Sequence, residues 1–255
     1  MKQQDFNAII LSGGSSSRMK MTTDIPKQLL PIHNNKTLLQ HQIEWLRSSG
    51  IENIILAIDS GTHEYIVDHL PYLLKMAEVS AEMEKLGTGG AIKQALNLVT
   101  SEKIYVMNVD DFILSDFYTP DELVDTIDRG FNASILTSRG MFPYGVIRSR
   151  GRRVTKFEQK PVMDFKVSTG HYAFDVSTVE KRFHPLGDFE GAMLPILAKE
   201  KVLTFMDLDG IWSTTNTWKE LVNTRQLIKS YYNRKLYGSS RPVSDIGFAG
   251  YGKIR

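Results

Sequence analysis

The chain has 255 residues, of which 42% are hydrophobic and 24% charged; this is ordinary usage for a globular protein and argues against disorder. Its 31 Lys and Arg residues against 29 Asp and Glu residues give a formal net charge of +2, which excludes the strongly basic surface of a dedicated nucleic-acid binder. The absence of cysteine excludes disulfides, zinc–thiolate clusters and cysteine nucleophiles.

The N-terminal segment shows no pattern typical of a targeting sequence. Its apolar stretch, residues 6–11, is too short for the hydrophobic core of a signal peptide, and glycines follow it rather than a cleavage site. No later run approaches the length needed to span a membrane. The six histidines show no metal-site spacing such as HExxH. We therefore expect a cytoplasmic protein without a nucleic-acid or membrane partner.

Short apolar runs alternate with longer helical patterns through the first half of the chain. Runs that read as buried strands occupy residues 8–11, 53–58 and 104–108. Helices are expected over residues 37–48, 63–76 and 90–98. This alternation is typical of βαβ units and predicts a mostly parallel sheet.

From residue 131 onward, successive strand candidates are separated by polar turns. The expected strands are residues 133–138, 145–150, 154–158, 169–175, 202–206 and 211–214. The strands up to residue 175 are expected to extend the sheet in antiparallel fashion. Thr217 and Glu220 have the spacing of a capping box and predict the start of a long final helix.

The strongest local signal directly follows the first expected strand. Residues 11–19 read LSGGSSSRM, and residues 24–32 read DIPKQLLPI. Glycines let backbone N–H groups approach an anion closely, and the hydroxyl side chains, Arg18 and Lys27 add donors suited to a triphosphate. The alternative is a tight turn with solvated basic side chains, which a Gly-Gly-Ser segment alone would favour. The segment is neither a Walker A loop nor GxGxxG.

This loop and the segments after it resemble the signature of nucleotidyltransferases, in particular the branch that acts on sugar 1-phosphates. That branch has GGxGTRL followed by PK and LxPI. Similar segments follow in the family's order: EKLGTGGAI (84–92), VMNVDD (106–111), PYGVI (143–147), KFEQKP (156–161), STGHYAF (168–174) and GIWSTTNT (210–217). They resemble LGTAGAL, NGD, YGVV, FEEKP, NAGIYVF and GYWxDIGT, respectively. Each motif is weak alone, but this shared order is not expected by chance.

The resemblance implies an α/β fold, a three-layer α/β/α sandwich of the Rossmann-like nucleotidyltransferase type with a mixed, mostly parallel sheet. It implies one catalytic domain over residues 1–238, with a nucleotide-binding half (1–130) and an acceptor-binding half (131–238), before a tail over residues 239–255. The implied reaction condenses a nucleoside triphosphate with a sugar 1-phosphate to give a nucleotide sugar and pyrophosphate, with Mg²⁺ as cofactor. Short family members include thymidylyl-, cytidylyl- and heptose guanylyltransferases, which serve polysaccharide or modified-sugar pathways.

The motif matches assign residues to the nucleotide one by one. Gly13 and Gly14 would cradle the phosphates, and Arg18 and Lys27 would neutralise charge on the leaving pyrophosphate. Asp110, at the end of a strand, would hold magnesium. The nucleotide-binding set that the resemblance implies is Leu11, Gly13, Gly14, Ser15, Ser16, Ser17, Glu82, Gly87, Thr88 and Asn108.

The second half of the chain carries the residues assigned to the acceptor. Lys160 would hold the attacking phosphate and would complete a catalytic set with Arg18, Lys27 and Asp110. The acceptor-binding set that the resemblance implies is Tyr144, Gly145, Glu158, Lys160, Thr169, Gly170 and Glu190. For Tyr144, as for Phe174 and Trp212, packing in the core is at least as good an interpretation.

Some positions depart from the family pattern. Ser16 replaces the third glycine of the loop, as in the GGxSxRM form of molybdenum-cofactor guanylyltransferases, and Gln159 replaces a glutamate. Thr214 replaces the second metal carboxylate, and a hydroxyl is a poorer magnesium ligand than a carboxylate. Asn216 stands where related cytidylyltransferases, with a WxPMDT-like stretch, carry an acid. Its amide oxygen could complete a metal site with Asp110.

These departures leave other functions open. One is nucleotidyl transfer to a non-sugar phosphorylated acceptor, including the molybdenum-cofactor type, and another is an inactive regulatory relative that binds nucleotide sugars. Because the charged residues expected to carry catalysis are all present, catalysis is favoured over degeneracy. The nucleobase, the acceptor and the number of subunits cannot be read from these residues, although the oligomers common in the family leave a homo-oligomer open.

Overall fold

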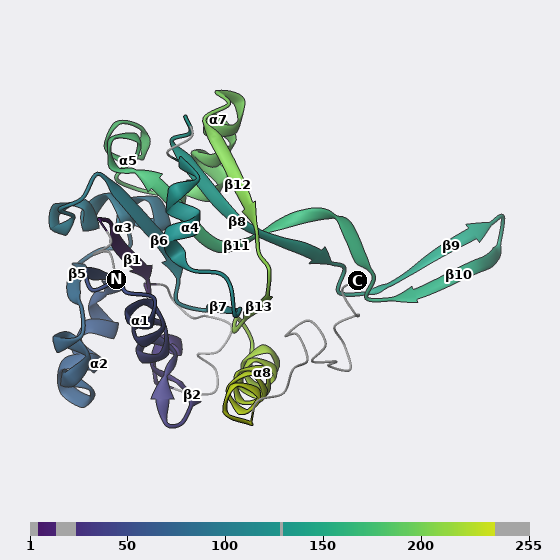
Figure 1. Ribbon diagram of the computed structural model, residues 1–255, viewed down its shortest axis with the longest axis horizontal. Coiled ribbons are helices and arrows are strands. Elements are labelled where there is room, and N and C mark those ends of the chain that lie inside the picture. The colour runs from purple at the N-terminus through teal and green to yellow at the C-terminus, as the bar shows by residue number, and fades with distance from the viewer. Residues whose placement is uncertain (1–4, 14–23, 128–129, 238–255) are drawn as a thin grey trace.

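The computed structural model describes residues 5–13, 24–127 and 130–237, with a seven-stranded sheet at its centre (Figure 1). Its strands are β1 (Asn7–Leu11), β4 (Ile54–Asp59), β5 (Glu78–Glu82), β6 (Lys103–Asn108), β8 (Ala133–Met141), β11 (Val162–Asp175) and β12 (Leu203–Asp207). Their order across the sheet is β12-β8-β11-β6-β1-β4-β5. β11 runs antiparallel to β6 and β8, and the other neighbours are parallel. The predicted mixed, mostly parallel sheet is confirmed.

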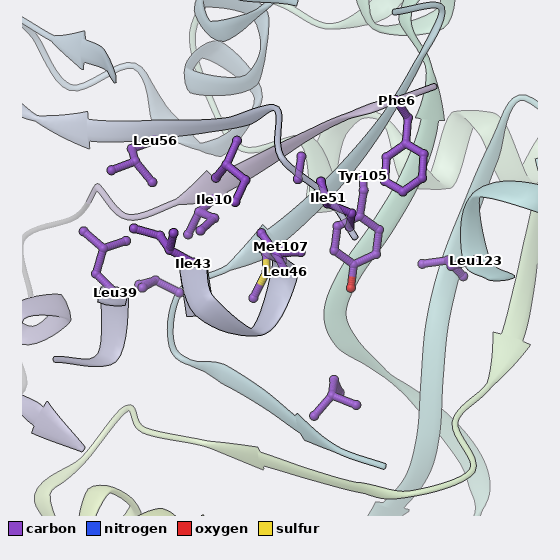
Figure 2. Packing of buried hydrophobic residues seen from close by; sticks show 14 of the residues in the cluster. Phe6, Ile10, Leu39, Ile43, Leu46, Ile51, Leu56, Tyr105, Met107 and Leu123 are labelled. Atoms are coloured by element: carbon purple, nitrogen blue, oxygen red, sulfur yellow. The ribbon is translucent and has the colours of Figure 1, made fainter. Parts of the chain in front are cut away.

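Helices cover both faces of the sheet. One face carries α1 (Leu38–Ser48), α2 (Ser60–His69) and α4 (Pro120–Asp125), and the other carries α3 (Gly87–Ala95), α5 (Val176–Arg182), α6 (Phe189–Ala192) and α7 (Leu194–Lys199). The two apolar clusters between the layers follow the alternation of side chains along the strands. Ile10 of β1 packs on the α1 side, beside Ile43 and Met107 (Figure 2), whereas Ile9 and Leu11 pack on the α3 side.

Smaller elements flank the sheet beside α1. β2 (Pro31–His33) pairs with β3 (Lys36–Thr37), and β7 (Asp111–Leu114) pairs with β13 (Ile211–Thr214). Against them packs α8 (Trp218–Tyr237), through a third apolar cluster. The predicted capping box of α8 is confirmed, because Thr217 N–H donates to Glu220 Oε2 over 2.8 Å and Glu220 N–H donates to Thr217 Oγ1 over 3.3 Å. No described helix combines the length and apolar character needed to cross a membrane.

The helix predicted over residues 63–76 needs correction. α2 begins earlier because the Asp59 side chain caps it, accepting Thr62 N–H over 2.9 Å. It also ends earlier, because the residue before Pro71 is disfavoured in helical backbone. Residues Pro71–Lys75 form a separate 3₁₀ helix.

The expected strands around residues 150 and 155 form an arm instead of joining the sheet. Within the described residues, β9 (Gly145–Arg150) and β10 (Arg153–Gln159) pair with each other and project from the body (Figure 1). The reason is that β8 and β11 already pair directly, with Met141 opposite Val162, so the chain between these residues is an excursion beyond the sheet. Among the described elements, no layer packs on either face of the arm, and Phe157 is 63% exposed.

Candidate active site

The parallel strands β1, β4, β5 and β6 all end at the same edge of the sheet. This is the edge at which open α/β sheets place ligands. Among the residues predicted from sequence, Glu82 and Asn108 end their strands here and Gly13 follows β1. The remaining members of the first loop lie outside the described residues: Gly14, Ser15, Ser16, Ser17 and Arg18.

Lys27, Asp110 and Asn216 meet at this edge from segments far apart in the chain. Lys27 opens a 3₁₀ helix (Lys27–Leu29), Asp110 lies between β6 and β7, and Asn216 lies between β13 and α8. Lys27 Nζ is 2.5 Å from Asp110 Oδ2 and 3.4 Å from Asn216 Oδ1. The Lys27 and Asp110 side chains are only 14% and 17% exposed, so solvent screens their attraction poorly.

Two oxygen atoms thus face one cation, which is also the environment that a hard divalent ion needs. Asn216 Nδ2 donates to Thr214 Oγ1 over 2.8 Å, which leaves Oδ1 directed toward Lys27. A carboxylate and an amide oxygen are ligand types that hard divalent cations take, so these are the two side chains here that could hold a metal. In the part of the chain that the structure describes, no group of three or more acidic or histidine side chains could hold a metal.

Asp111, directly after Asp110, is a buried acid that the sequence interpretation did not single out. Its Oδ1 accepts Trp212 Nε1–H over 2.8 Å, and its Oδ2 accepts Asn108 Nδ2–H over 3.1 Å. Burial, and then the charge of Asp110, raise the pKa of Asp111 to about 7. A Cβ at Gly170 would overlap Asp111 Oδ2, so this predicted acceptor residue must be glycine for the carboxyl group to fit. The sequence feature that could have indicated Asp111 was a second acidic residue directly after Asp110.

A buried polar chain fixes Asp111 from behind. The Asp111 carbonyl accepts His171 Nε2–H over 3.1 Å, so His171 Nδ1 is free to accept the Tyr105 hydroxyl over 2.5 Å. Tyr118 lies 3.1 Å from Tyr105, hydroxyl to hydroxyl. Complete burial lowers the pKa of His171 to about 4 and keeps it neutral. Gln42 Nε2–H adds a 2.8 Å bond to the same carbonyl.

A cavity of about 150 Å³ opens between the ends of β1 and β5 and the start of α3. Its lining consists of Leu11, Gly13, Ala57, Glu82, Lys85, Gly87, Thr88, Ala91 and Asp188. It therefore collects five of the predicted nucleotide residues, Leu11, Gly13, Glu82, Gly87 and Thr88. Glu82 is 8% exposed, and burial raises the pKa of its carboxyl group.

At one wall of this cavity, the start of α3 lies close to the segment that leads into α6. The helix predicted over residues 90–98 instead runs from Gly87 to Ala95, and Leu96–Leu98 form a separate 3₁₀ turn. A Cβ at Gly87 would lie 2.7 Å from the Gly187 backbone, so only glycine permits this close approach. Thr88 Oγ1 donates to Glu190 Oε2 over 2.7 Å, and Thr88 N–H donates to Asp188 Oδ1 over 3.1 Å. Glu190, predicted to bind the acceptor, therefore contacts a residue predicted to bind the nucleotide.

The other predicted acceptor residues divide into two groups. Thr169 and Gly170 lie in the buried part of β11, where Thr169 Oγ1–H donates to the Leu136 carbonyl over 2.9 Å. Tyr144, Gly145, Glu158 and Lys160 lie in the arm or at its base, and Tyr144 is 70% exposed. Among the described residues, no hydrogen bond or ion pair joins the Lys160 ammonium to the cluster around Asp110. The role of these residues stays a prediction.

Comparison with known proteins agrees with this architecture. The sequence model of a family described as nucleotidyl transferase matches residues 7–230. The chain is 30% identical over 224 residues to mannose-1-phosphate guanyltransferase beta-B of Xenopus laevis, covering 81% of this chain and 60% of that protein. It thus spans less than two thirds of that relative's length.

Two further comparisons agree. Mannose-1-phosphate guanyltransferase of Pichia angusta is 29% identical over 244 residues, covering 90% of this chain and 66% of that protein. HddC from Yersinia pseudotuberculosis, solved with GMP-PN, shares the fold with a TM-score of 0.65 and 22% identity over 88% of this chain and 99% of that chain.

Proposed function

The chain belongs to the nucleotidyl transferase family, and from this premise we propose that it condenses a nucleoside triphosphate with a sugar 1-phosphate and releases pyrophosphate. The observation that carries the proposal is the cluster of Lys27, Asp110 and Asn216 at the same sheet edge as the cavity of predicted nucleotide residues. The names of the relatives support GTP and mannose 1-phosphate as the first pair to assay.

The reaction joins two anions, so positioning and charge neutralisation are its main requirements. An oxygen of the acceptor phosphate attacks the α-phosphorus of the nucleotide, and the bond from that phosphorus to the bridging oxygen of pyrophosphate breaks. Lys27 would exchange its contact with Asp110 for one with the phosphates. Asp110 and Asn216 would then hold magnesium, which when bound adds positive charge beside the phosphates.

A pyrophosphate-release assay tests the proposal. The protein would be incubated with Mg²⁺, each common nucleoside triphosphate, and a panel of sugar 1-phosphates and non-sugar phosphates. We expect turnover with a sugar 1-phosphate, and its loss when EDTA removes the metal. Turnover with non-sugar acceptors alone would refute the sugar assignment. Nucleotide binding without turnover on any acceptor would support the inactive regulatory relative instead.

A further inference from the structure

The β9–β10 arm and its base gather the exposed apolar side chains of the described residues. Of the 17 large apolar side chains exposed there, eight lie within residues 142–165. We propose that the arm is a self-association surface, and that its apolar face packs against the same face of a second copy of this chain. The inference concerns assembly and does not rest on the proposed reaction.

The register of β9 and β10 divides the arm into two chemically different faces. Residues opposite each other in an antiparallel pair point to the same side, and successive residues along a strand alternate. Ile147 lies opposite Phe157, and Ser149 lies opposite Val154, so these side chains share one face. Ile147, Phe157 and Val154 are 55%, 63% and 53% exposed. None of the side chains in these two pairs is charged.

The opposite face of the arm is basic. Arg148 lies opposite Lys156, and Arg150 lies opposite Arg153. Lys156 Nζ is 2.7 Å from Glu158, the one acidic side chain of residues 145–159. Two basic faces would repel each other, whereas contact between two apolar faces brings no charges together. Charge therefore selects the apolar face for contact between copies.

The arm also lacks the support that a ribbon of two strands normally needs. An isolated two-stranded ribbon is marginally stable in water, and a third strand or a packed layer is required to stabilise it. Among the described elements, β9 and β10 pair only with each other. A second arm would supply the missing layer, because two ribbons packed face to face form a small sandwich. It would also steady Glu158 in the arm and Lys160 at its base, two of the predicted acceptor residues.

The size of the apolar patch fits a weak dimer. Phe142 and Phe165, at the base of the arm, are 39% and 51% exposed and can extend the contact made by Ile147, Val154 and Phe157. The exposed parts of these five side chains amount to roughly 500 Å² per copy, or about 1,000 Å² for two copies, which is near the lower limit of specific interfaces. A two-fold contact uses the same patch in both copies and closes at two subunits. A second copy therefore matches the patch in both size and lack of charge.

Sedimentation velocity over a series of protein concentrations tests the inference. We expect the wild type to form a dimer that dissociates on dilution from about 100 μM. Ile147→Ser combined with Phe157→Ser should raise the dissociation constant of the dimer by about a hundredfold or more, because each copy loses two apolar side chains from the contact. Arg148→Ser combined with Lys156→Ser, on the opposite face of the same strands, is the matched control and should keep the dimer. Thermal melts check the fold of each variant.

Cross-linking identifies which faces meet without removing an apolar side chain. The chain has no cysteine, so each introduced cysteine is a unique reporter. Ser149→Cys and Gln159→Cys place thiols at the two ends of the apolar face, and Arg148→Cys places one on the basic face. A bismaleimide that spans about 10 Å, the spacing of packed sheets, should link two copies of Ser149→Cys, two copies of Gln159→Cys, or one of each in a mixture. It should not link two copies of Arg148→Cys.

Several results would overturn the inference. A wild type that stays monomeric at about 100 μM is one, and a dimer that survives the Ile147 and Phe157 substitutions is another. A dimer that dissociates when NaCl is raised from about 50 mM to about 500 mM would show instead that the basic face binds an acidic surface of the other copy. Linking through Arg148→Cys alone, or through none of the three cysteines, would exclude contact between apolar faces. None of these measurements uses nucleotide or acceptor, so the proposed reaction is tested separately.

Discussion

The sheet edge and the β9–β10 arm both carry segments that resemble the family's motifs, but the fold treats them differently. At the edge, Lys27 and Asp110 form an ion pair across 83 positions of sequence, with both side chains largely buried. In the arm, Lys156 and Glu158 pair along one strand, with side chains 56% and 49% exposed. A sheet covered by helices can hold together side chains that are far apart in the sequence, whereas an uncovered two-stranded ribbon pairs side chains that are close in the sequence. A motif thus locates a residue in the chain, and burial decides whether its partners are already in place.

The largest expected effect is at the edge. Lys27→Ala should lower turnover by about a hundred- to a thousandfold, because it removes a poorly screened cation from the proposed phosphate site. Pyrophosphate release measures the effect. Lys36→Ala is a matched control, since Lys36 forms an ion pair with Glu44 while remaining 41% exposed. A loss below tenfold in Lys27→Ala, with the fold intact, would show that the ordered edge is not the site of phosphate chemistry.

Lys160→Ala tests whether the base of the arm joins the edge during turnover. If Lys160 holds the attacking phosphate, turnover should fall by about a hundredfold. Lys160 has a positive φ of 50°, so its backbone is held in an uncommon conformation just before β11. Lys156→Ala, in the exposed part of the arm, is the control. If Lys160→Ala and Lys156→Ala are equally active, Lys160 takes no part in catalysis, and the catalytic centre is confined to the sheet edge.

Two glycines with left-handed backbone allow the regions to be compared by stability. Gly170 (φ 75°) faces the Asp111 carboxyl group. At Gly151 (φ 57°), in the turn of the arm, no atom of the described residues other than its chain neighbours lies within 4 Å of the position that a Cβ would take. Gly170→Ala should therefore lower the free energy of unfolding by about 2–3 kcal/mol, through strain and overlap together. Gly151→Ala should cost about 1 kcal/mol, from strain alone. Denaturant unfolding measures both, and equal losses would refute the tight contact at Gly170.

The sequence predicted what depends on local pattern. The apolar run at 8–11 marks a central strand because residues on both of its faces are buried, and the capping box at Thr217 marks α8 because its bonds are local. It could not place β9 and β10, because their separation from the sheet follows from the distant pairing of β8 with β11.

The roles of the candidate site residues stay predictions, but part of their arrangement could be expected from the sequence. Lys27, Asp110 and Asn216 do meet, although the pairing of an ammonium with the expected metal ligand was not foreseen. Asp111 was missed because its importance comes from burial and from donors on β6 and β13, and neither is visible in the letters VDD. The closeness of the Glu82 carboxylate to Gly13 likewise appears only in the structure.

The buried region should also show a pH dependence of stability that the exposed arm lacks. The pKa of His171 is about 4 in the folded chain, against 6.5 for an ordinary histidine. As pH falls below 6.5, His171 takes up a proton in the unfolded chain but stays neutral in the folded chain. The free energy of unfolding therefore decreases until pH reaches about 4.

His171→Gln can still donate to the Asp111 carbonyl and accept from Tyr105. Between pH 7 and about 4.5, its free energy of unfolding should fall by on the order of 2 kcal/mol less than that of the wild type. His41, also buried with a pKa of about 4, contributes equally to both proteins. Glu158→Gln, in the exposed arm, should follow the wild-type profile; parallel profiles for His171→Gln and the wild type would mean that His171 is not held neutral behind the site.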